Sequence, residues 1–385
     1  MPGYEFFGNE ERRLANEVFD NGNILMRHGF DHQRTNQRYF VKEFEAEFAQ
    51  YMSSDHALAV SSGTAALRVA LAALEIKPGD EVITQSFTFV ATVEAIVESG
   101  AKPICTNIDH TLNMDPEDLL KKISKKTKAV IVVHMLGTPA NLEKISNICK
   151  ERDIYLIEDT AWGCGGSLKG RKLGNWGDIG TFSFDYAKAI TTGEGGMLIF
   201  RDKKVYEKAA AWHDHGHENN PNLPRWKDSR SSSGFNFRMS ELQGAIGLAQ
   251  LNKLDAIISS QRSVSEMICD AIRDIDKFLI RPAPEGSYET RDALVLITPT
   301  KEIALRARES LLNNNLSTKI LPEAYTWHFS LTWDHIDQLS IDARTRIDLA
   351  SSASLLERCL ALPISRHMNE MTAKTIYKSL QHSLK

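Results

Sequence analysis

The sequence predicts an α/β protein, with a mostly parallel central sheet in a large domain and a smaller α+β domain after it. Short apolar strands alternate with helices over residues 57–161, which is typical of a parallel sheet covered on both faces. The chain has 385 residues, more than the roughly 250 to 300 at which a single core stops growing. The alternation changes after Phe200. We therefore place the large domain at 1–255 and the small domain at 256–385.

Composition limits the classes of function. The net charge is -4 with both signs interspersed, so no basic surface for nucleic acid is expected. The five cysteines are scattered and lack CxxC spacing, which indicates neither a disulfide framework nor a zinc site. The first residues are charged and helical, and no apolar run approaches about 18 residues. We expect a reduced, cytoplasmic protein without a metal and without contact to a membrane.

Local patterns predict each element of the large domain in order. Apolar residues at helical spacing predict helices at 10–19 and 44–51, with a polar loop at 29–38 between them. The expected strands are 57–60, 80–87, 102–108, 129–136 and 154–161. The helices between them begin near residues 65, 88, 115 and 141.

Polar groups lie where these strands end. The turn Ser61-Ser62-Gly63-Thr64 precedes a helix, so its backbone N–H groups form a ready anion site, although an ordinary helix cap has the same pattern. Ligands of parallel sheets collect beyond the carboxyl ends of the strands. We expect five groups to converge at that edge: the Ser62–Thr64 turn, Phe89, His134, Asp159 and the turn that carries Lys188.

The stretch from Thr181 to Phe200 carries the chemistry. Lys188 lies between two strand-like segments, close to glycines that let backbone approach a ligand. It is a candidate for a buried amine that forms a Schiff base, and the alternative is a solvated surface lysine.

If Lys188 binds pyridoxal phosphate, three further groups are required. Asp159 can hold the pyridine nitrogen, the Ser62–Thr64 turn with Ser183 can hold the phosphate, and Phe89 can stack on the ring. Each residue also has a structural alternative, as a turn cap, a helix cap or a core side chain.

The pattern changes beyond Phe200. A helix near 204–212 precedes a polar stretch at 213–233 with three histidines, which we interpret as a mobile flap or lid. Its His-x-His-x-His spacing permits a metal site, but incidental hydrogen bonds are the preferred interpretation. Residues 234–275 predict one long helix, and short strands then alternate with helices from about residue 278.

Taken in order, these motifs resemble the DegT/StrS class of pyridoxal-phosphate sugar aminotransferases. The similar pieces are SSGTAAL, QSFTFVATVEAI, LIEDTA, GDIGTFSFDYAKAITTGEGG, His215-Gly216 and FNFRMSELQGAIGLAQL. The motifs run from about Gly8 to Pro363, and the block around Lys188 is the most specific. The resemblance implies the aspartate-aminotransferase fold, which is fold type I of these enzymes, and a homodimer with shared active sites.

The resemblance also implies roles for single residues. Lys188 would be the Schiff base and proton shuttle, and Asp159 would bind the pyridinium nitrogen. The other implied cofactor contacts are Ser62, Gly63, Thr64 and Ser183 on the phosphate, Phe89 on the ring, and Asn236 reaching the neighbouring subunit's phosphate. Trp162 stands where the class usually has His or Gln, and its indole N–H can still donate a hydrogen bond.

Other pieces are similar to the 8-amino-3,8-dideoxy-manno-octulosonate transaminases within that class, which aminate an octulosonic acid destined for lipopolysaccharide. They are MPGYEFFGNEE, GFDHQR, HDHGHE, FNFRMSELQGAIGLAQLNKLD and WHFSLTWDHI. A carboxylated sugar requires cations. The candidate substrate residues are Arg34, His215, His217, Arg238 and Trp327. Alternatively, Arg238 is a helix-end charge, and Trp327 and Trp333 belong to the core of the small domain.

We therefore expect an aminotransferase that moves an amino group from L-glutamate to a keto or aldehydo sugar, with an 8-oxo-3-deoxy-octulosonate as the favoured substrate. The alternative substrate is a UDP-, GDP- or dTDP-linked 3- or 4-keto sugar. A pyridoxal-phosphate sugar dehydratase has histidine at the lysine position, so Lys188 disfavours it. A non-catalytic regulator would have lost the lysine or gained a nucleic-acid-binding appendage.

Overall fold

The structure is a computed structural model that describes residues 3–22, 25–27, 38–220, 222–322 and 325–385. Its centre is a seven-stranded sheet with the order β1-β9-β8-β5-β4-β2-β3. These strands are β1 (His56–Val60), β2 (Glu81–Gln85), β3 (Lys102–Thr106), β4 (Thr127–Val133), β5 (Tyr155–Asp159), β8 (Ile179–Ser183) and β9 (Gly196–Phe200). Strand β9 is antiparallel to both its neighbours, and the other pairs are parallel. The prediction of a mostly parallel sheet is confirmed.

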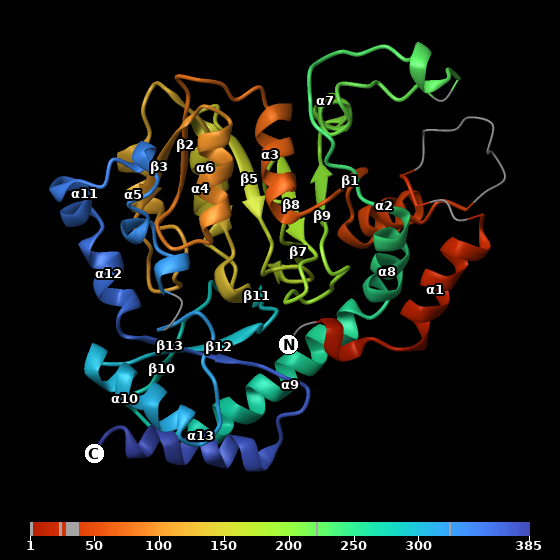
Figure 1. Cartoon of the computed structure of the whole chain (residues 1–385). Helices are drawn as coiled ribbons and strands as arrows, with labels where there is room; N and C mark the ends of the chain where they lie inside the picture. Colours follow the sequence, from red (N-terminus) through yellow and green to blue (C-terminus); the bar gives the residue numbers. More distant parts are fainter. Residues whose placement is uncertain (1–2, 23–24, 28–37, 221, 323–324) are drawn as a thin grey trace.

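Helices cover both faces of this sheet because side chains alternate along its strands. Leu58 and Val60 pack with α3 and α7, whereas Ala57 and Ala59 pack with α2 and α8. The helices of this part are α1 (Asn9–Asp20), α2 (Phe40–Met52), α3 (Gly63–Ala73), α4 (Val90–Glu98), α5 (Pro116–Lys122), α6 (Leu142–Glu151), α7 (Lys203–Trp212) and α8 (Glu241–Leu251). Figure 1 shows α3, α4 and α6 lying along the sheet.

The single helix predicted over 234–275 is wrong, because the structure has two helices there. Helix α8 begins only at Glu241, where Ser240 and Gln243 form a capping box. Helix α9 (Leu254–Ile272) follows after a corner at Asn252 and Lys253. The Lys253 ammonium bonds the Glu11 carboxylate at 2.8 Å and the Phe6 carbonyl at 3.1 Å. These contacts hold the corner against the N-terminal residues.

A second, antiparallel sheet lies at the other end of the molecule (Figure 1) and has the order β10-β12-β13. Its strands are β10 (Leu279–Ile280), β12 (Ala293–Ile297) and β13 (Cys359–Pro363), and it packs with α9, α10 (Lys301–Leu312) and α13 (Glu370–His382). A small sheet of β6 (Ser167–Leu168), β7 (Arg171–Lys172) and β11 (Ser287–Tyr288) joins the two parts. The domain division at 255/256 stays a prediction.

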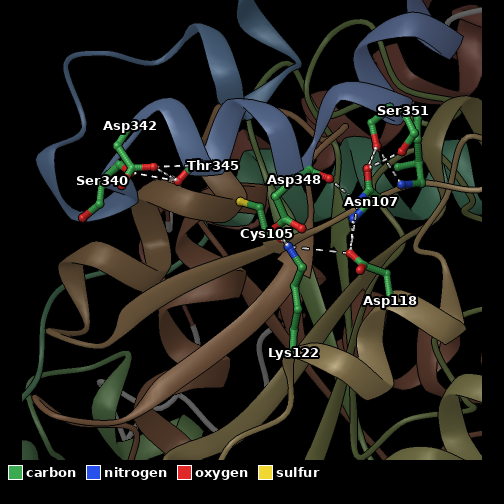
Figure 2. Close-up of polar contacts among 11 residues, drawn as sticks. Cys105, Asn107, Asp118, Lys122, Ser340, Asp342, Thr345, Asp348 and Ser351 are labelled. Carbon is green, nitrogen blue, oxygen red and sulfur yellow. Dashed lines mark hydrogen bonds and ion pairs between the residues drawn. The ribbon is translucent and has the colours of Figure 1, made fainter.

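Residues 325–357, here called the return segment, lead back from the second sheet to the β3 edge of the first (Figure 1). They contain α11 (Ala343–Asp348) and α12 (Ala350–Leu356). Figure 2 shows how the segment is attached: the Asn107 side chain donates to the Asp348 carbonyl at 2.7 Å and accepts from the Ser351 hydroxyl at 2.8 Å. Lys122 bonds both the Cys105 carbonyl and the Asp348 carboxylate.

Short 3₁₀ helices complete the described chain. They are η1 (Gly3–Phe6), η2 (Met135–Gly137), η3 (Arg225–Lys227), η4 (Tyr325–Trp327), η5 (Ser330–Thr332) and η6 (Asp337–Leu339). Among the residues described, none of the helices combines the length and the apolar character needed to cross a bilayer.

Candidate active site

A cavity of about 290 Å³ opens beyond the carboxyl ends of β1, β5 and β8. Parallel strands end at the same edge of a sheet, so the residues that follow them are brought together there. The predicted residues that line the cavity are Ser62, Gly63, Thr64, Phe89, Asp159, Trp162, Ser183 and Lys188. Thr88, Thr92 and His328 line it as well. One edge of the sheet therefore gathers an amine, a carboxylate, hydroxyls and a helix N-terminus.

The N-terminus of α3 forms one wall. Ser62 is its N-cap and accepts a hydrogen bond from the Ala65 N–H at 3.0 Å. The N–H groups of the first helical residues, Gly63 and Thr64, have no partner within the helix and carry its positive end. A Cβ on Gly63 would lie 2.7 Å from the Ser183 Cβ. Glycine is thus required for the close approach of α3 to β8, and the result is a cradle for an anion.

Asp159, the last residue of β5, is 6% exposed and is held by two donors. The Thr92 hydroxyl donates to its Oδ2 at 3.0 Å, and the Ala161 N–H donates to its Oδ1 at 3.2 Å. Burial raises the pKa of Asp159, and these hydrogen bonds and the Lys188 charge oppose that rise. The carboxylate is therefore fixed in orientation and suited to bind a cationic N–H.

Lys188 lies half-buried in the turn between β8 and β9. Its Nζ is 3.4 Å from the centroid of the Trp162 ring. Burial lowers the pKa of Lys188 to about 8, against the opposing effect of the Asp292 carboxylate. An amine with this pKa is partly neutral close to neutral pH, which a nucleophile or proton acceptor needs.

Two rings face each other at the outer side of the cavity. Phe89 is 41% exposed, and its ring centroid lies 5.5 Å from that of His328, which is 7% exposed. His328 comes from the return segment, where its carbonyl accepts from the Thr88 N–H at 3.0 Å. His328 was not among the predicted site residues, although it lies in the stretch WHFSLTWDHI, next to Trp327.

His134 does not reach the cavity, contrary to expectation. Val133 lines the cavity, and the next side chain along the strand points to the opposite face. There the His134 Nε2 lies 3.2 Å from the Glu158 carboxylate, and its Nδ1 accepts from the Ala140 N–H. The residue thus stabilises the loops behind the sheet.

The predicted substrate residues that the structure describes do not meet at the cavity either. Arg34 lies outside the described residues. Arg238 bonds the Asp214 carboxylate, and the His217 Nδ1 lies 3.2 Å from the Asp228 carboxylate. His215 and Trp327 are exposed, the latter by 62%, and neither lines the cavity. The sequence shows these charges, but it does not show the acids that pair with two of them.

Residues 213–220 and 222–233, here called the arm, are bonded internally. Arg225 makes two hydrogen bonds to Asp214, at 2.7 and 2.6 Å, and Asp228 accepts from the Asn219 N–H at 2.8 Å. His213, Asp214 and His217 are buried, so the first residues of this polar stretch pack against the rest of the chain, and its role as a mobile lid stays a prediction. The described residues contain no group of three metal-ligating side chains.

Asn236 is exposed and lies outside the cavity of its own chain. Its backbone forms a bridge with Asp214. Its expected contact with a neighbouring subunit stays a prediction.

The chain is similar to several known proteins. Residues 25–381 match the DegT/DnrJ/EryC1/StrS aminotransferase family. A GDP-perosamine synthase of Vibrio cholerae is 38% identical over 269 residues, which cover 69% of each chain. One of Escherichia coli O157:H7 is 36% identical over 290 residues, 75% of this chain and 77% of that protein. The structure of an aminotransferase from Psychrobacter cryohalolentis is 26% identical, with a TM-score of 0.87 over 98% of this chain and 97% of that one.

Proposed function

The chain belongs to the DegT/DnrJ/EryC1/StrS aminotransferase family, and on this premise we propose that it transfers the amino group of L-glutamate to a carbonyl carbon of a nucleotide-linked keto sugar. It is a pyridoxal-phosphate-dependent sugar aminotransferase with the fold of that group. The observation that carries the proposal is the meeting of Lys188, Asp159 and the α3 N-terminus in one cavity.

The residues of the cavity fit the cofactor. Pyridoxal phosphate supplies an aldehyde that accepts an amino group and a ring that withdraws electrons from the reacting carbon. Gly63, Thr64 and Ser183 would hold its phosphate, since the helix N-terminus and a hydroxyl converge where Gly63 leaves room. Asp159 would bind the pyridinium nitrogen, and Phe89 would cover one face of the ring.

Lys188 and Asp159 would have different roles in the reaction: Lys188 would move a proton, and Asp159 would bind the pyridinium nitrogen. The Lys188 Nζ would take up the proton from Cα of glutamate and hold it, and it would return a proton to the carbon of the sugar that receives the amino group. The donors from Thr92 and Ala161 favour the charged form of Asp159, which the pyridinium partner requires. The Trp162 ring, 3.4 Å from the Lys188 Nζ, would shield the amine from water on one side.

The substrate that we propose differs from the one favoured by sequence alone. The two relatives described above are named as synthases of a GDP-linked sugar, which supports the nucleotide-linked alternative. An octulosonic acid would need cations for its carboxylate, but Arg238 and His217 are engaged by Asp214 and Asp228. We therefore propose the nucleotide-linked keto sugar in place of the octulosonate.

A homodimer with shared active sites is part of the proposal. Its support is the position of Asn236, which is exposed at the base of the arm and outside its own cavity. Each copy would complete the phosphate site of the other.

The experiment follows the visible absorbance of the bound cofactor. L-glutamate should bleach the band and D-glutamate should not. A GDP-linked 4-keto sugar should then restore it, in parallel with UDP- and dTDP-linked keto sugars and with the octulosonic aldehyde. Recovery with the octulosonic aldehyde alone would overturn the substrate and leave the reaction intact. No bleaching by L-glutamate would overturn the proposed amino donor.

A further inference from the structure

Two charged residues behind the cavity have no part in the proposed reaction. Asp292 immediately precedes β12, and Lys319 lies between α10 and β13. The Lys319 Nζ is 2.6 Å from the Asp292 Oδ2, and the side chains are 20% and 3% exposed, respectively. Burial raises the pKa of Asp292, but the Lys319 ammonium holds it below its usual value. A charged pair of this kind is costly to bury, so its position next to the cavity needs an explanation.

Trp162 connects this pair to the reacting amine. Its ring lies under the Lys188 Nζ at 3.4 Å and within 4.9 Å of the Lys319 Nζ. Its carbonyl accepts a hydrogen bond from the Thr290 hydroxyl at 3.0 Å. The segment that carries Asp292 therefore also fixes the backbone of Trp162.

The two charges act on Lys188 in opposite directions. Burial is the largest influence on its pKa and lowers it, the Asp292 carboxylate raises it, and the Lys319 ammonium lowers it. Among the described residues, Asp159 and Asp185 also act on Lys188 and raise its pKa. Glu194 and His328 are further titratable residues that line the cavity.

We propose that Asp292 and Lys319 are positioning residues that together set how readily Lys188 releases its proton, and that the Trp162 ring holds the protonated amine whenever Lys188 is not bonded to the cofactor. The inference rests on the proposed function, because it assigns the proton transfers to Lys188. An ammonium over an aromatic face is attracted by the ring quadrupole. Asp292 and Lys319 set the electrostatic potential at the Lys188 amine, and the Trp162 ring fixes the position of that amine.

The test is a pH titration of the visible absorbance of the holoenzyme, which reports protonation at the Lys188 Nζ. D292N should lower the midpoint by about 1 pH unit, because it removes a nearby opposite charge. K319M should raise it by about 1 pH unit, because it removes a nearby like charge. The double variant D292N/K319M should lie between the single variants, and D292E and K319R should stay close to wild type.

A second readout does not depend on the cofactor. The full chain, freed of cofactor, is treated with an amine-reactive reagent at a series of pH values, and mass spectrometry follows the peptide that contains Lys188. The labelling midpoint should move down in D292N, up in K319M, and down in W162L. Lys208, an exposed lysine paired with Glu75, is the internal control and should label alike in all variants.

Midpoints that do not move in D292N and K319M, or that move in the same direction, would overturn the proposal. If one single variant does not fold, the other decides, since the sign of its shift is fixed. W162L tests the role of the ring separately, because loss of the ring must lower the midpoint, and an unchanged or raised midpoint would overturn that role. Failure of the proposed function would look different: K188A would retain transamination, whatever the titrations show.

Discussion

The inner and outer sides of the cavity hold their residues by different means. On the inner side, Gly63, Asp159 and Ser183 lie at or just beyond the ends of strands of the seven-stranded sheet, where sheet register fixes their spacing. On the outer side, His328 of the return segment lines the cavity, whereas the arm lies beyond it, and side-chain ion pairs such as Asp214 with Arg238 fix the charged candidates there. Sheet topology therefore brings strand-end residues together, whereas a charged loop residue forms an ion pair with whichever carboxylate lies next to it in the folded chain.

The largest expected effect is on the inner side. Lys188→Ala removes the group that moves the proton, and we expect kcat to fall by about 10²- to 10⁴-fold. Stopped-flow absorbance with L-glutamate measures the first half-reaction. The matched control is Lys208→Ala on the exposed face of α7, which should leave the rate unchanged. A wild-type rate in Lys188→Ala would show that Lys188 does not transfer the proton, and it would contradict the assignment of the reaction to the inner side.

Gly63→Ala tests whether the cradle needs its close approach. The new Cβ would lie 2.7 Å from the Ser183 Cβ, and overpacking of this kind costs about 1 to 3 kcal/mol. If this free energy destabilises the cofactor-bound protein and not the cofactor-free protein, the cofactor binds about 5- to 150-fold more weakly. Fluorescence titration of the cofactor-free chain measures this affinity. Gly8→Ala is the control, because a Cβ there meets nothing nearer than 4.0 Å, and equal affinities in both variants would contradict the prediction.

Asp214→Asn tests the ion pairs of the outer side. Burial raises the pKa of Asp214, but Arg225 and Arg238 hold it at about 2, below the unfolded value of about 3.9. A depressed carboxyl pKa stabilises the fold above the unfolded pKa, by about 2 kcal/mol. This stabilisation is lost as the pH falls from about 4 to about 2.

Urea unfolding of wild type and Asp214→Asn measures the difference. It should be about 2 kcal/mol at pH 7 and should shrink below about pH 4. His213, whose pKa burial lowers to about 3, is present in both proteins and largely cancels. Glu75→Gln, which breaks an exposed pair with Lys208, is the control and should cost less than about 1 kcal/mol. A difference that is constant with pH would exclude the ion pairs as its source.

The smallest expected effect is on the KM for the sugar, and it distinguishes the neighbouring residues Trp327 and His328. His328→Ala removes the ring that lies against Phe89, and an aromatic pair contributes about 0.5 to 1.5 kcal/mol. We expect KM for the sugar to rise about 2- to 12-fold, since each 1.4 kcal/mol is tenfold. Trp327→Ala should change it less than about twofold, because Trp327 is exposed and does not line the cavity. A larger effect of Trp327→Ala in steady-state kinetics would reverse the comparison.

The sequence predicted the inner side well because its pattern is periodic. Near-continuous apolar runs placed Asp159 and the Ser62–Thr64 turn at strand ends, and the structure brings both to one cavity. The prediction for His134 was wrong for two reasons. Side chains alternate between the two faces of a strand, which turns His134 away from the cavity. In addition, the end of β4 was predicted three residues too late.

The outer side was harder to predict because its contacts link distant residues. Nothing local to Arg238 shows that Asp214, 24 residues earlier, takes its charge. The long helix was mispredicted because its apolar spacing continues through the corner at Lys253, which Glu11 stabilises from the far end of the chain. His328 lies within a stretch that resembles the family, but nothing in that stretch indicates that it reaches the cavity. The structure shows this through the hydrogen bond from the Thr88 N–H to the His328 carbonyl.

The antiparallel strand β9 has a consequence for the order of folding. Strands β8 and β9 pair as neighbours across the short turn that carries Lys188, so this pairing closes a small loop and costs little chain entropy. The pairing of β1 with β9 joins segments about 140 residues apart, and contacts of such high sequence separation form slowly. The lysine turn can therefore form early on the folding pathway. The Ser62–Thr64 wall reaches it only when β1 docks on β9, so a chain that lacks this docking presents the amine without a site for the phosphate.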